Sequence, residues 1–224
     1  MSILRECKDY CLRNNLLSCK EILVGVSGGA DSMCLLDLLC KMKDLGEELP
    51  FFPAISVAHV HHGLRESANF DENIVKAYCE KRDIPLYVCH ADVAREASTR
   101  RIGIEEAGRL VRYGFFTETA SRMKVSREDV FIAVAHHMDD QAETILLNLF
   151  RGAGTDGLCG IYPRNGNLIR PLLFATKEDI LQYVEENSIP FVSDQTNSEN
   201  DYMRNRMRNQ VLPVILQAIG KDPV

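Results

Sequence analysis

The sequence predicts an α/β protein built on a doubly wound parallel sheet, with helices on both faces and a short helical C-terminal extension. Two observations support this fold class. Short, almost uninterrupted apolar runs alternate with stretches of helical periodicity, which is typical of a parallel sheet buried on both faces. Polar motifs directly follow several of these runs, and sheets of this class bind ligands beyond the carboxyl ends of their strands.

Four apolar runs are predicted to form the strands of this sheet. They are rich in Val, Ile, Leu and Ala, and they cover residues 21–26, 54–60, 85–90 and 130–136. The stretch NLIRPLL at 167–173 is expected to supply a further strand.

Helical periodicity fills the segments between and after these runs. We expect helices over about 33–42, 68–82, 104–122, 139–150, 177–187 and 204–219. Thr176 is a suitable N-cap for the helix that begins at 177. The segment RGAGTDGLCGIYPRNGN after Phe150 is rich in Gly and polar residues, so we predict a long loop there.

The composition is that of an ordinary globular protein. Of its 224 residues, 46% are hydrophobic and 26% are charged, which excludes a disordered, collagen-like or low-complexity chain. The chain contains 26 Lys and Arg and 32 Asp and Glu, which gives a net charge of −6. This acidic balance argues against a generic nucleic-acid binder. We expect a single domain over 1–224, with a core at about 20–190 and a helical tail at about 195–224.

The cysteines and the N-terminal segment point to the cytoplasm. The eight cysteines form no Cys-x-x-Cys pair, so we expect reduced thiols rather than disulfides or a metal site. The start, MSILRECKDY, lacks the basic region followed by an apolar run of a signal peptide. No apolar run approaches the roughly 18 residues of a membrane span, so we expect no membrane association.

The first apolar run leads into a loop suited to phosphate, made of Ser27, Gly28, Gly29, Ala30, Asp31 and Ser32. Its glycines let backbone N–H groups approach an anion, and the following helix N-terminus adds further donors. An acid such as Asp31 is unexpected in a loop that holds only an anion, but is explained if it binds Mg²⁺. An ordinary capped turn remains the alternative.

Two other nucleotide-binding signatures are not met. The P-loop pattern Gly-x-x-x-x-Gly-Lys-Ser/Thr is absent. A Gly-x-Gly-x-x-Gly match at Gly152, Gly154 and Gly157 follows a predicted helix instead of a strand, so the dinucleotide-binding context is missing.

The loop SGGADS resembles the PP-loop of the N-type ATP pyrophosphatases, which cleave ATP between the α and β phosphates and adenylate a substrate. Further segments narrow the resemblance, in the order HVHHGLRESA, GIEEAGRLVRY, AHHMDDQAETILLNLFRGAGTDGL, IRPLL and SDQTNSENDYMRNRMRNQVLP. Together, from about 21 to about 214, the chain is similar to the tRNA(Ile)-lysidine synthase family. This resemblance implies an adenine-nucleotide alpha hydrolase-like fold.

The resemblance also implies a reaction. Lysine is ligated to C2 of the wobble cytidine of tRNA(Ile) with a CAU anticodon, through an adenylated cytidine, and lysidine, AMP and pyrophosphate are formed. It implies ATP and Mg²⁺ as cofactors and L-lysine as the second substrate. The expected catalytic residues are Asp31, His137, Asp140 and Glu143, with Asp31 and Asp140 also the candidate Mg²⁺ ligands.

Other site residues are expected on the same basis. Ala58 and His59 would line the adenine pocket through their backbone. The candidate contacts to tRNA or phosphate are Arg109, Arg112, Arg204 and Arg208, although such arginines are also common on solvated helix faces. Asp140 and Glu143 are three residues apart and so share one helix face. The alternative for the acids is that they are ordinary N-terminal helix residues.

Competing functions remain open at this point. Base thiolation or amidation by another PP-loop enzyme is one, although thiolating relatives usually need a cysteine pair. A His/Asp metal-dependent hydrolase built on HVHHG and HHMDD is another, but it would leave SGGADS without a role. A non-catalytic nucleotide-binding module would not need the acids in each motif. Family members commonly carry further C-terminal domains. We therefore expect that the chain is a minimal member of the family, a trimmed piece of a longer protein, or a protein that binds tRNA together with a second subunit, as in a homodimer.

Overall fold

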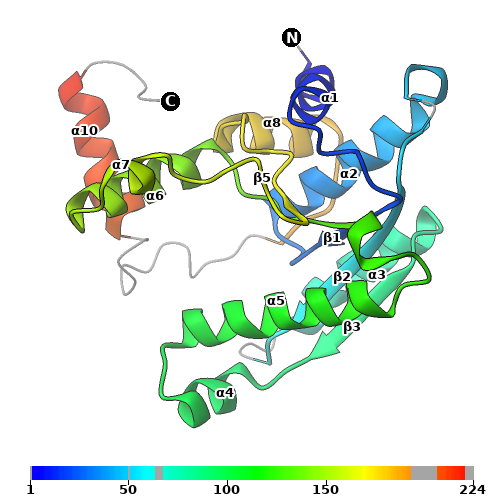
Figure 1. Cartoon of the computed structure of the whole chain (residues 1–224), viewed down its shortest axis with the longest axis horizontal. Helices are drawn as coiled ribbons and strands as arrows, with labels where there is room; N and C mark the ends of the chain where they lie inside the picture. The colour runs from blue at the N-terminus through cyan, green and yellow to red at the C-terminus, as the bar shows by residue number, and fades with distance from the viewer. Residues whose placement is uncertain (1, 50, 64–67, 193–205, 220–224) are drawn as a thin grey trace.

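A computed structural model describes residues 2–49, 51–63, 68–192 and 206–219. It confirms the predicted fold class. Six strands form one sheet in the order β3-β2-β1-β4-β6-β5 (Figure 1). They are β1 (Glu21–Gly25), β2 (Ala54–His61), β3 (Leu86–His90), β4 (Val130–Ala133), β5 (Arg164–Asn165) and β6 (Leu168–Ile169).

The order of the strands reverses at β1. This strand pairs in parallel with β2 on one side and with β4 on the other. β3 extends the sheet beyond β2, and β6 extends it beyond β4. β5 is the antiparallel member, paired with β6 in a short hairpin.

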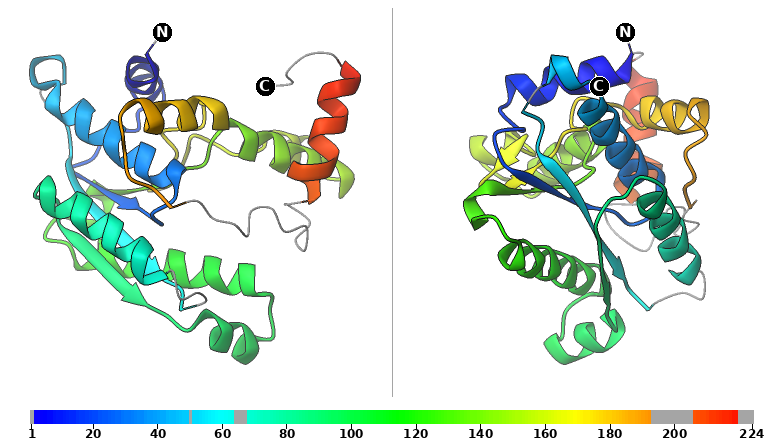
Figure 2. Two further views of the ribbon diagram at one scale, coloured as in Figure 1. Left: turned by 180° about the vertical axis from the view of Figure 1, so that it is seen from behind. Right: turned by 90° about the vertical axis from the view of Figure 1, so that its right-hand side faces the viewer.

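Helices cover both faces of the sheet. On one face lie α1 (Ile3–Arg13), α2 (Ala30–Asp44), α3 (Ala68–Lys81) and α8 (Lys177–Glu186), which share a core with one set of strand side chains. α5 (Ile104–Arg122) covers the other face with the alternate set (Figure 2). Thus Ile22 and Val24 face the first core and Leu23 faces the second, as the two-residue period of a strand requires.

The remaining helices extend from this layered body. They are α4 (Val93–Arg100), α6 (Met138–Phe150), α7 (Thr155–Leu158) and α10 (Leu212–Ile219), with shorter turns η1 (Gly46–Glu48), η2 (Arg127–Asp129) and η4 (Met207–Val211). η4 and α10 lie beside α6 (Figure 1). Among the described residues, none of the helices combines the length and the apolarity that crossing a bilayer requires.

Some element boundaries differ from the predicted ones. The run 130–136 is strand only as far as Ala133, because the chain leaves the sheet there to begin α6. Only Leu168 and Ile169 of the stretch 167–173 are strand. The predicted loop after Phe150 contains the one-turn helix α7 and strand β5. Of the expected C-terminal tail, 195–205 and 220–224 lie outside the described residues.

A buried carboxylate joins three of the helices. Asp37 of α2 is 3% exposed and accepts hydrogen bonds of 2.6 Å from the Tyr78 hydroxyl of α3 and the Tyr183 hydroxyl of α8. Lys41 Nζ and Arg82 Nη2 each lie 3.0 Å from one of its oxygens. The carboxylate therefore fixes α2, α3 and α8 relative to one another.

These partners keep Asp37 ionised. Burial by itself would raise the pKa of Asp37, but the hydrogen bonds from Tyr183, Tyr78 and Lys41 outweigh burial and hold it below its ordinary value. A lowered pKa means that the ionised carboxylate stabilises the folded state.

We predict that Asp37→Asn lowers the free energy of unfolding by about 3–5 kcal/mol near pH 7. The substitution removes the negative charge that Lys41 and Arg82 pair with, and leaves this buried group of partners uncompensated. Urea denaturation measures this loss. The difference from wild type should persist above pH ~3.9, the ordinary pKa of Asp, and shrink as the pH falls through the lower pKa of the folded state.

Asp44→Asn is the matched control. Asp44 lies on the same helix and pairs with the same Arg82, at 3.7 Å, but its side chain is 71% exposed. An exposed pair contributes at most about 1 kcal/mol. Equal losses in the two variants would contradict the role assigned to Asp37.

Candidate functional site

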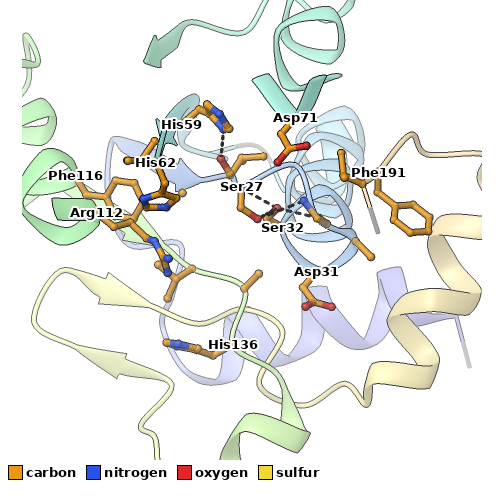
Figure 3. A pocket seen from close by; sticks show the side chains of 18 of the residues that line it. Ser27, Asp31, Ser32, His59, His62, Asp71, Arg112, Phe116, His136 and Phe191 are labelled. Atoms are coloured by element: carbon orange, nitrogen blue, oxygen red, sulfur yellow. Dashed lines mark hydrogen bonds between the residues drawn. The ribbon is translucent and has the colours of Figure 1, made fainter. Parts of the chain in front are cut away.

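A cavity of about 730 Å³ opens at the carboxyl ends of β1, β2 and β4. Its lining comes from the loop after β1, the end of β2, the first turn of α3, α5, the segment after β4, and α8 (Figure 3). This is the point at which the strand order reverses, where α/β sheets bind ligands. The polar motifs that are far apart in the sequence therefore meet at one place.

The loop Ser27–Ser32 is held in shape by its own hydroxyls. Ser32 Oγ accepts a hydrogen bond of 3.1 Å from the Ser27 backbone N–H and donates one of 3.0 Å to the Gly29 carbonyl. Gly29 is the N-cap of α2 and supplies no side-chain cap. Because the first N–H groups of a helix have no acceptor within it, the start of α2 offers donors to an anion.

Gly28 is required by the path of this loop. Its φ is +93°, a conformation that residues with a Cβ rarely adopt. A Cβ at this position would also lie 3.3 Å from the carbonyl oxygen of Asp71 in α3. The loop can therefore turn tightly against α3 only with glycine at 28.

Most of the residues expected to bind ATP line the cavity. These are Ser27, Gly29, Ala30, Asp31, Ser32 and His59. Gly28 and Ala58 are not among the lining residues; the Ala58 carbonyl instead accepts a 2.9 Å hydrogen bond from the Val26 N–H. The structure thus places the loop at the cavity, and the spacing of the motif did not indicate which of its residues face inward.

A buried histidine lies among three acids. His137 is 2% exposed at the N-cap of α6, with Nε2 3.8 Å from Asp31 Oδ2 and 3.5 Å from Asp140 Oδ2. Its Nδ1 is 3.2 Å from Asp139 Oδ2. Because one nitrogen approaches both Asp31 and Asp140, these two carboxylates converge although their residues are 109 positions apart in the sequence.

The charges of this cluster support each other. Burial alone would lower the pKa of His137, but the hydrogen bond to Asp139 and the charges of Asp140 and Asp31 prevail and raise it. The hydrogen bond from His137 in turn lowers the pKa of Asp139 to about 2. The folded protein therefore favours a positive imidazolium between negative carboxylates.

A lysine that the sequence did not single out completes this side of the cavity. Lys177, the first residue of α8, forms an ion pair with Asp31 and lines the cavity. Its backbone N–H donates a 2.8 Å hydrogen bond to Asp139 Oδ2. One signal was available in the sequence: Lys at the first position of a helix opposes the helix dipole, so its presence there calls for a partner or a ligand.

The other expected site residues are divided between the cavity and its surroundings. Arg112 and Asp140 line the cavity, whereas His137 and Glu143 are not among the lining residues, and Glu143 is fully buried. Arg109 is exposed, with its guanidinium 5.7 Å from the Tyr113 ring centroid. Arg204 lies outside the described residues, and Arg208 falls in the turn Met207–Val211.

The histidine beside His137 is the one that lines the cavity. His136 faces the cavity (Figure 3), and its Nδ1 accepts a 3.1 Å hydrogen bond from Arg170 Nε. Arg170 belongs to the IRPLL segment and is 9% exposed. The motif was visible in the sequence, but its contact with His136 was not.

The acids of the cavity have the ligand chemistry that Mg²⁺ prefers. Mg²⁺ takes oxygen ligands and is commonly held by one or two carboxylates together with substrate phosphates, and the carboxylates of Asp31 and Asp140 both lie within 4 Å of His137 Nε2. Within the described ranges, no three His, Cys, Asp or Glu side chains are arranged to hold a metal ion.

Comparison with known proteins finds a family model and several relatives. The family model described as a PP-loop domain matches residues 5–215. The tRNA(Ile)-lysidine synthase of Clostridium acetobutylicum is 44% identical over 206 residues, covering 91% of this chain and 43% of that protein. That of Petrotoga mobilis is 39% identical, covering 95% of this chain and 64% of that protein. The chain thus spans less than two thirds of either relative.

The fold also matches a solved structure. The U34-tRNA thiolase NcsA from Methanococcus maripaludis, solved with its [4Fe-4S] cluster, superposes with a TM-score of 0.70. The alignment covers 96% of this chain and 73% of that chain at 17% identity. At this identity the likeness concerns the fold.

We predict that His137→Gln lowers the free energy of unfolding by about 3 kcal/mol at pH 6, because three acids lose their buried cation. A raised pKa in the folded state contributes stability below the unfolded pKa of about 6.5, and this contribution is lost as the pH rises through the folded pKa. The difference from wild type should therefore be smaller at pH 9 than at pH 6.

Urea denaturation at the two pH values measures this effect. His90→Gln is the control, because His90 also pairs with an acid, Glu72, but its side chain is 65% exposed. If the free energy of unfolding of His137→Gln falls further below that of wild type at pH 9 than at pH 6, the prediction is contradicted, because His137 would then be neutral in the folded state.

Proposed function

The chain belongs to the PP-loop domain family, and on that premise we propose that it ligates lysine to C2 of the wobble cytidine of tRNA(Ile). The proposed reaction consumes ATP, passes through an adenylated cytidine, and gives lysidine, AMP and pyrophosphate. One observation carries the proposal: the loop Ser27–Ser32, the acids Asp31 and Asp140, and the cations Arg112 and Lys177 face one cavity. The names of the relatives supply the substrate, since geometry alone would suit any adenylating enzyme.

ATP would bind with its phosphates at the loop. The first-turn N–H groups of α2 and the loop hydroxyls are donors to phosphate oxygens. Lys177 and Arg112 add positive charge from α8 and α5. The loop Ser27–Ser32 contains no lysine of its own. In this proposal the positive charge that stabilises the leaving pyrophosphate comes from Lys177 and Arg112 instead.

The nucleoside would occupy the part of the cavity near β2. His59 is 2% exposed, and its Nδ1 lies 2.8 Å from the Val26 carbonyl. Burial lowers the pKa of His59, so a neutral ring lines this end. Val60 and Phe116 add apolar surface there, which suits a purine base.

Asp31 and Asp140 would hold Mg²⁺, which when bound neutralises charge on the phosphates. His137 holds these two carboxylates toward each other, since its Nε2 approaches both. Adenylation is needed because the C2 oxygen of cytosine is a poor leaving group. The lysine ε-amine must then lose a proton before it attacks. Glu143, buried one turn behind Asp140, would support this acid cluster and not contact substrate directly.

Further assignments belong to the same proposal. The anticodon would contact Arg112 in the cavity and the exposed Arg109 one turn earlier on α5, with Arg204 and Arg208 as additional phosphate contacts. L-lysine is the second substrate, the CAU anticodon is the target, and the enzyme works in the cytoplasm. A second subunit in a homodimer, or segments beyond this chain, would complete the grip on tRNA.

Base thiolation is the alternative within the family, and the cysteines argue against it. All eight lie in the described part of the chain as free thiols, and none lines the cavity. Only Cys159 is exposed. A sulfur-carrying mechanism would need a thiol or a cluster at the reacting base.

Incubation with ATP, labelled lysine and a tRNA(Ile) transcript tests the proposal. We expect label to enter the tRNA, and we expect Asp31→Asn to reduce pyrophosphate release by roughly 10²-fold or more, because a carboxylate at the phosphates is lost. Asp44→Asn, on the exposed end of the same helix, serves as the control. If label stays out of the tRNA while ATP still binds, only the family assignment would survive.

Gly28→Ala tests the phosphate loop separately. We expect ATP affinity, measured by calorimetry, to fall at least roughly tenfold, because a left-handed Ala costs about 1–2 kcal/mol and its Cβ would press on Asp71. Gly46→Ala is the control: its φ is also positive, at +52°, but nothing lies within 4 Å of the added Cβ. Both variants should lose stability, and an equal loss of ATP affinity in both would refute the role of the loop.

A further inference from the structure

We infer that His59 and Asp71 accept hydrogen bonds from the sugar hydroxyls of the bound nucleotide, and that they make the cavity select a ribonucleotide over a deoxynucleotide. The inference rests on the proposed function only for the presence of a nucleotide in the cavity. The two atoms that carry it, His59 Nε2 and Asp71 Oδ1, are buried polar atoms of the protein whatever reaction it catalyses.

Both atoms lack a hydrogen-bond donor. Within the part of the chain that the structure describes, His59 Nε2 and Asp71 Oδ1 are buried and have no hydrogen-bond partner. Buried polar groups of folded proteins are almost always paired, and an unpaired one costs stability. His59 is 2% exposed, and both residues line the cavity. A ligand that brings donors to this part of the cavity would satisfy both atoms.

The contact between His59 and Val26 determines which ring nitrogen is the acceptor. His59 Nδ1 lies 2.8 Å from the Val26 carbonyl oxygen, which can only accept, so Nδ1 carries a proton and donates. Burial lowers the pKa of His59, so the ring holds that one proton and is neutral. Nε2 therefore presents its lone pair, directed away from Val26.

Asp71 brings the second acceptor from α3. A Cβ added to Gly28 would lie 3.3 Å from the Asp71 carbonyl oxygen and 3.4 Å from its Cβ, so Asp71 packs against the phosphate loop. Its charge is near enough to His59 to act on the pKa of that ring, although burial has the larger effect. Figure 3 shows both side chains on the side of Ser27 away from His136. A nitrogen lone pair and a carboxylate oxygen thus share one part of the cavity.

The place of this pair beside the loop identifies the sugar as the donor. His59 is anchored to Val26, which directly precedes the loop, and Asp71 lies against Gly28 within it. The sugar is the part of a nucleotide that is joined directly to the phosphates. Ionised phosphate oxygens offer no donor and would be repelled by a carboxylate, whereas the 2′ and 3′ hydroxyls each offer one. An acid accepts from a ribose hydroxyl in dinucleotide-binding sheets for the same reason.

The other donor of ATP, the 6-amino group of adenine, fits this pair less well. The apolar surface proposed for the base comes from Val60 and Phe116, which belong to the core on the α5 face of the sheet. His59 lies two residues after Val57, whose side chain belongs to the core on the opposite face. Because side chains alternate along a strand, His59 points away from the surface proposed for the base.

Nucleotide binding to wild type tests the inference without any variant. Isothermal calorimetry compares ATP with its 2′-deoxy, 3′-deoxy and 2′,3′-dideoxy analogues, and with inosine triphosphate, which has an oxygen in place of the 6-amino group. We expect each missing hydroxyl to weaken binding roughly three- to tenfold, the effect of one hydrogen bond. If inosine triphosphate alone is weakened, the donor is the 6-amino group and the inference is overturned.

Variants of His59 separate its two contacts. His59→Asn places an amide nitrogen near the position of Nδ1, so the hydrogen bond to Val26 can be kept while the acceptor at Nε2 is lost. His59→Gln places an amide oxygen near Nε2 and loses the bond to Val26. We expect Asn to weaken ATP binding roughly three- to tenfold and to leave 2′,3′-dideoxy-ATP unaffected, and Gln to keep the preference for ATP. His90→Asn is the matched control, because the His90 side chain is 65% exposed.

Variants of Asp71 test the second acceptor. Asp71→Ala removes the carboxylate but keeps the backbone and Cβ, which are the parts of Asp71 that lie against Gly28. We expect it to reduce the preference for ATP over 2′,3′-dideoxy-ATP roughly three- to tenfold. Asp71→Asn retains an acceptor oxygen and should retain most of the preference. Asp44→Ala, at a side chain that is 71% exposed, is the control.

The inference is overturned if wild type binds 2′,3′-dideoxy-ATP as tightly as ATP. It is also overturned if His59→Asn and Asp71→Ala weaken both nucleotides equally, because the two residues would then only shape the loop. Failure of the proposed function is a different result, in which lysine does not enter tRNA(Ile) while the sugar preference in ATP binding remains. Conversely, lysine transfer that proceeds equally well with 2′,3′-dideoxy-ATP would support the function and refute the inference.

Discussion

The reversal of strand order at β1 is the constraint on which the rest of this structure depends. Because β1 pairs in parallel with both β2 and β4, the segments that leave all three strands emerge at one edge of the sheet. α2 begins on one side of this edge and α6 begins beside it (Figure 1). The cavity, its phosphate loop and its acids exist because these chain segments diverge from neighbouring strands.

The helices at this edge are held in register by a second, buried interaction. Asp37 of α2 and Tyr183 of α8 are joined by a hydrogen bond, and each lies six residues beyond a charged residue of the site, Asp31 and Lys177. The same two helices therefore carry a structural pair in the core and a functional pair at the cavity. The contact between Asp37 and Tyr183 and the ion pair between Asp31 and Lys177 therefore both join α2 to α8.

Much of this could be read from the sequence because its signals are local. A strand followed by Ser-Gly-Gly and a helix is encoded within a dozen residues, and the apolar runs located β1, β2 and β3 closely. Other elements lacked such signals: α1 and α4 have ordinary amphipathic sequences, and β5 is formed by two residues of a hairpin. Arg170 and Lys177 were not selected, since their partners, His136 and Asp31, lie 34 and 146 residues away.

By itself, the sequence determined the fold class and the loop between β1 and α2, because these depend on periodicity and on contacts between near neighbours, and it suggested a phosphate-binding role for that loop. Only the tertiary structure decided which of two adjacent histidines lines the cavity and which is buried among three acids that raise its pKa. It also decided which distant cations approach the loop. The physical reason is that orientation at the end of a strand, and the charge state of a buried ring, are set by side chains brought together through folding from remote parts of the chain.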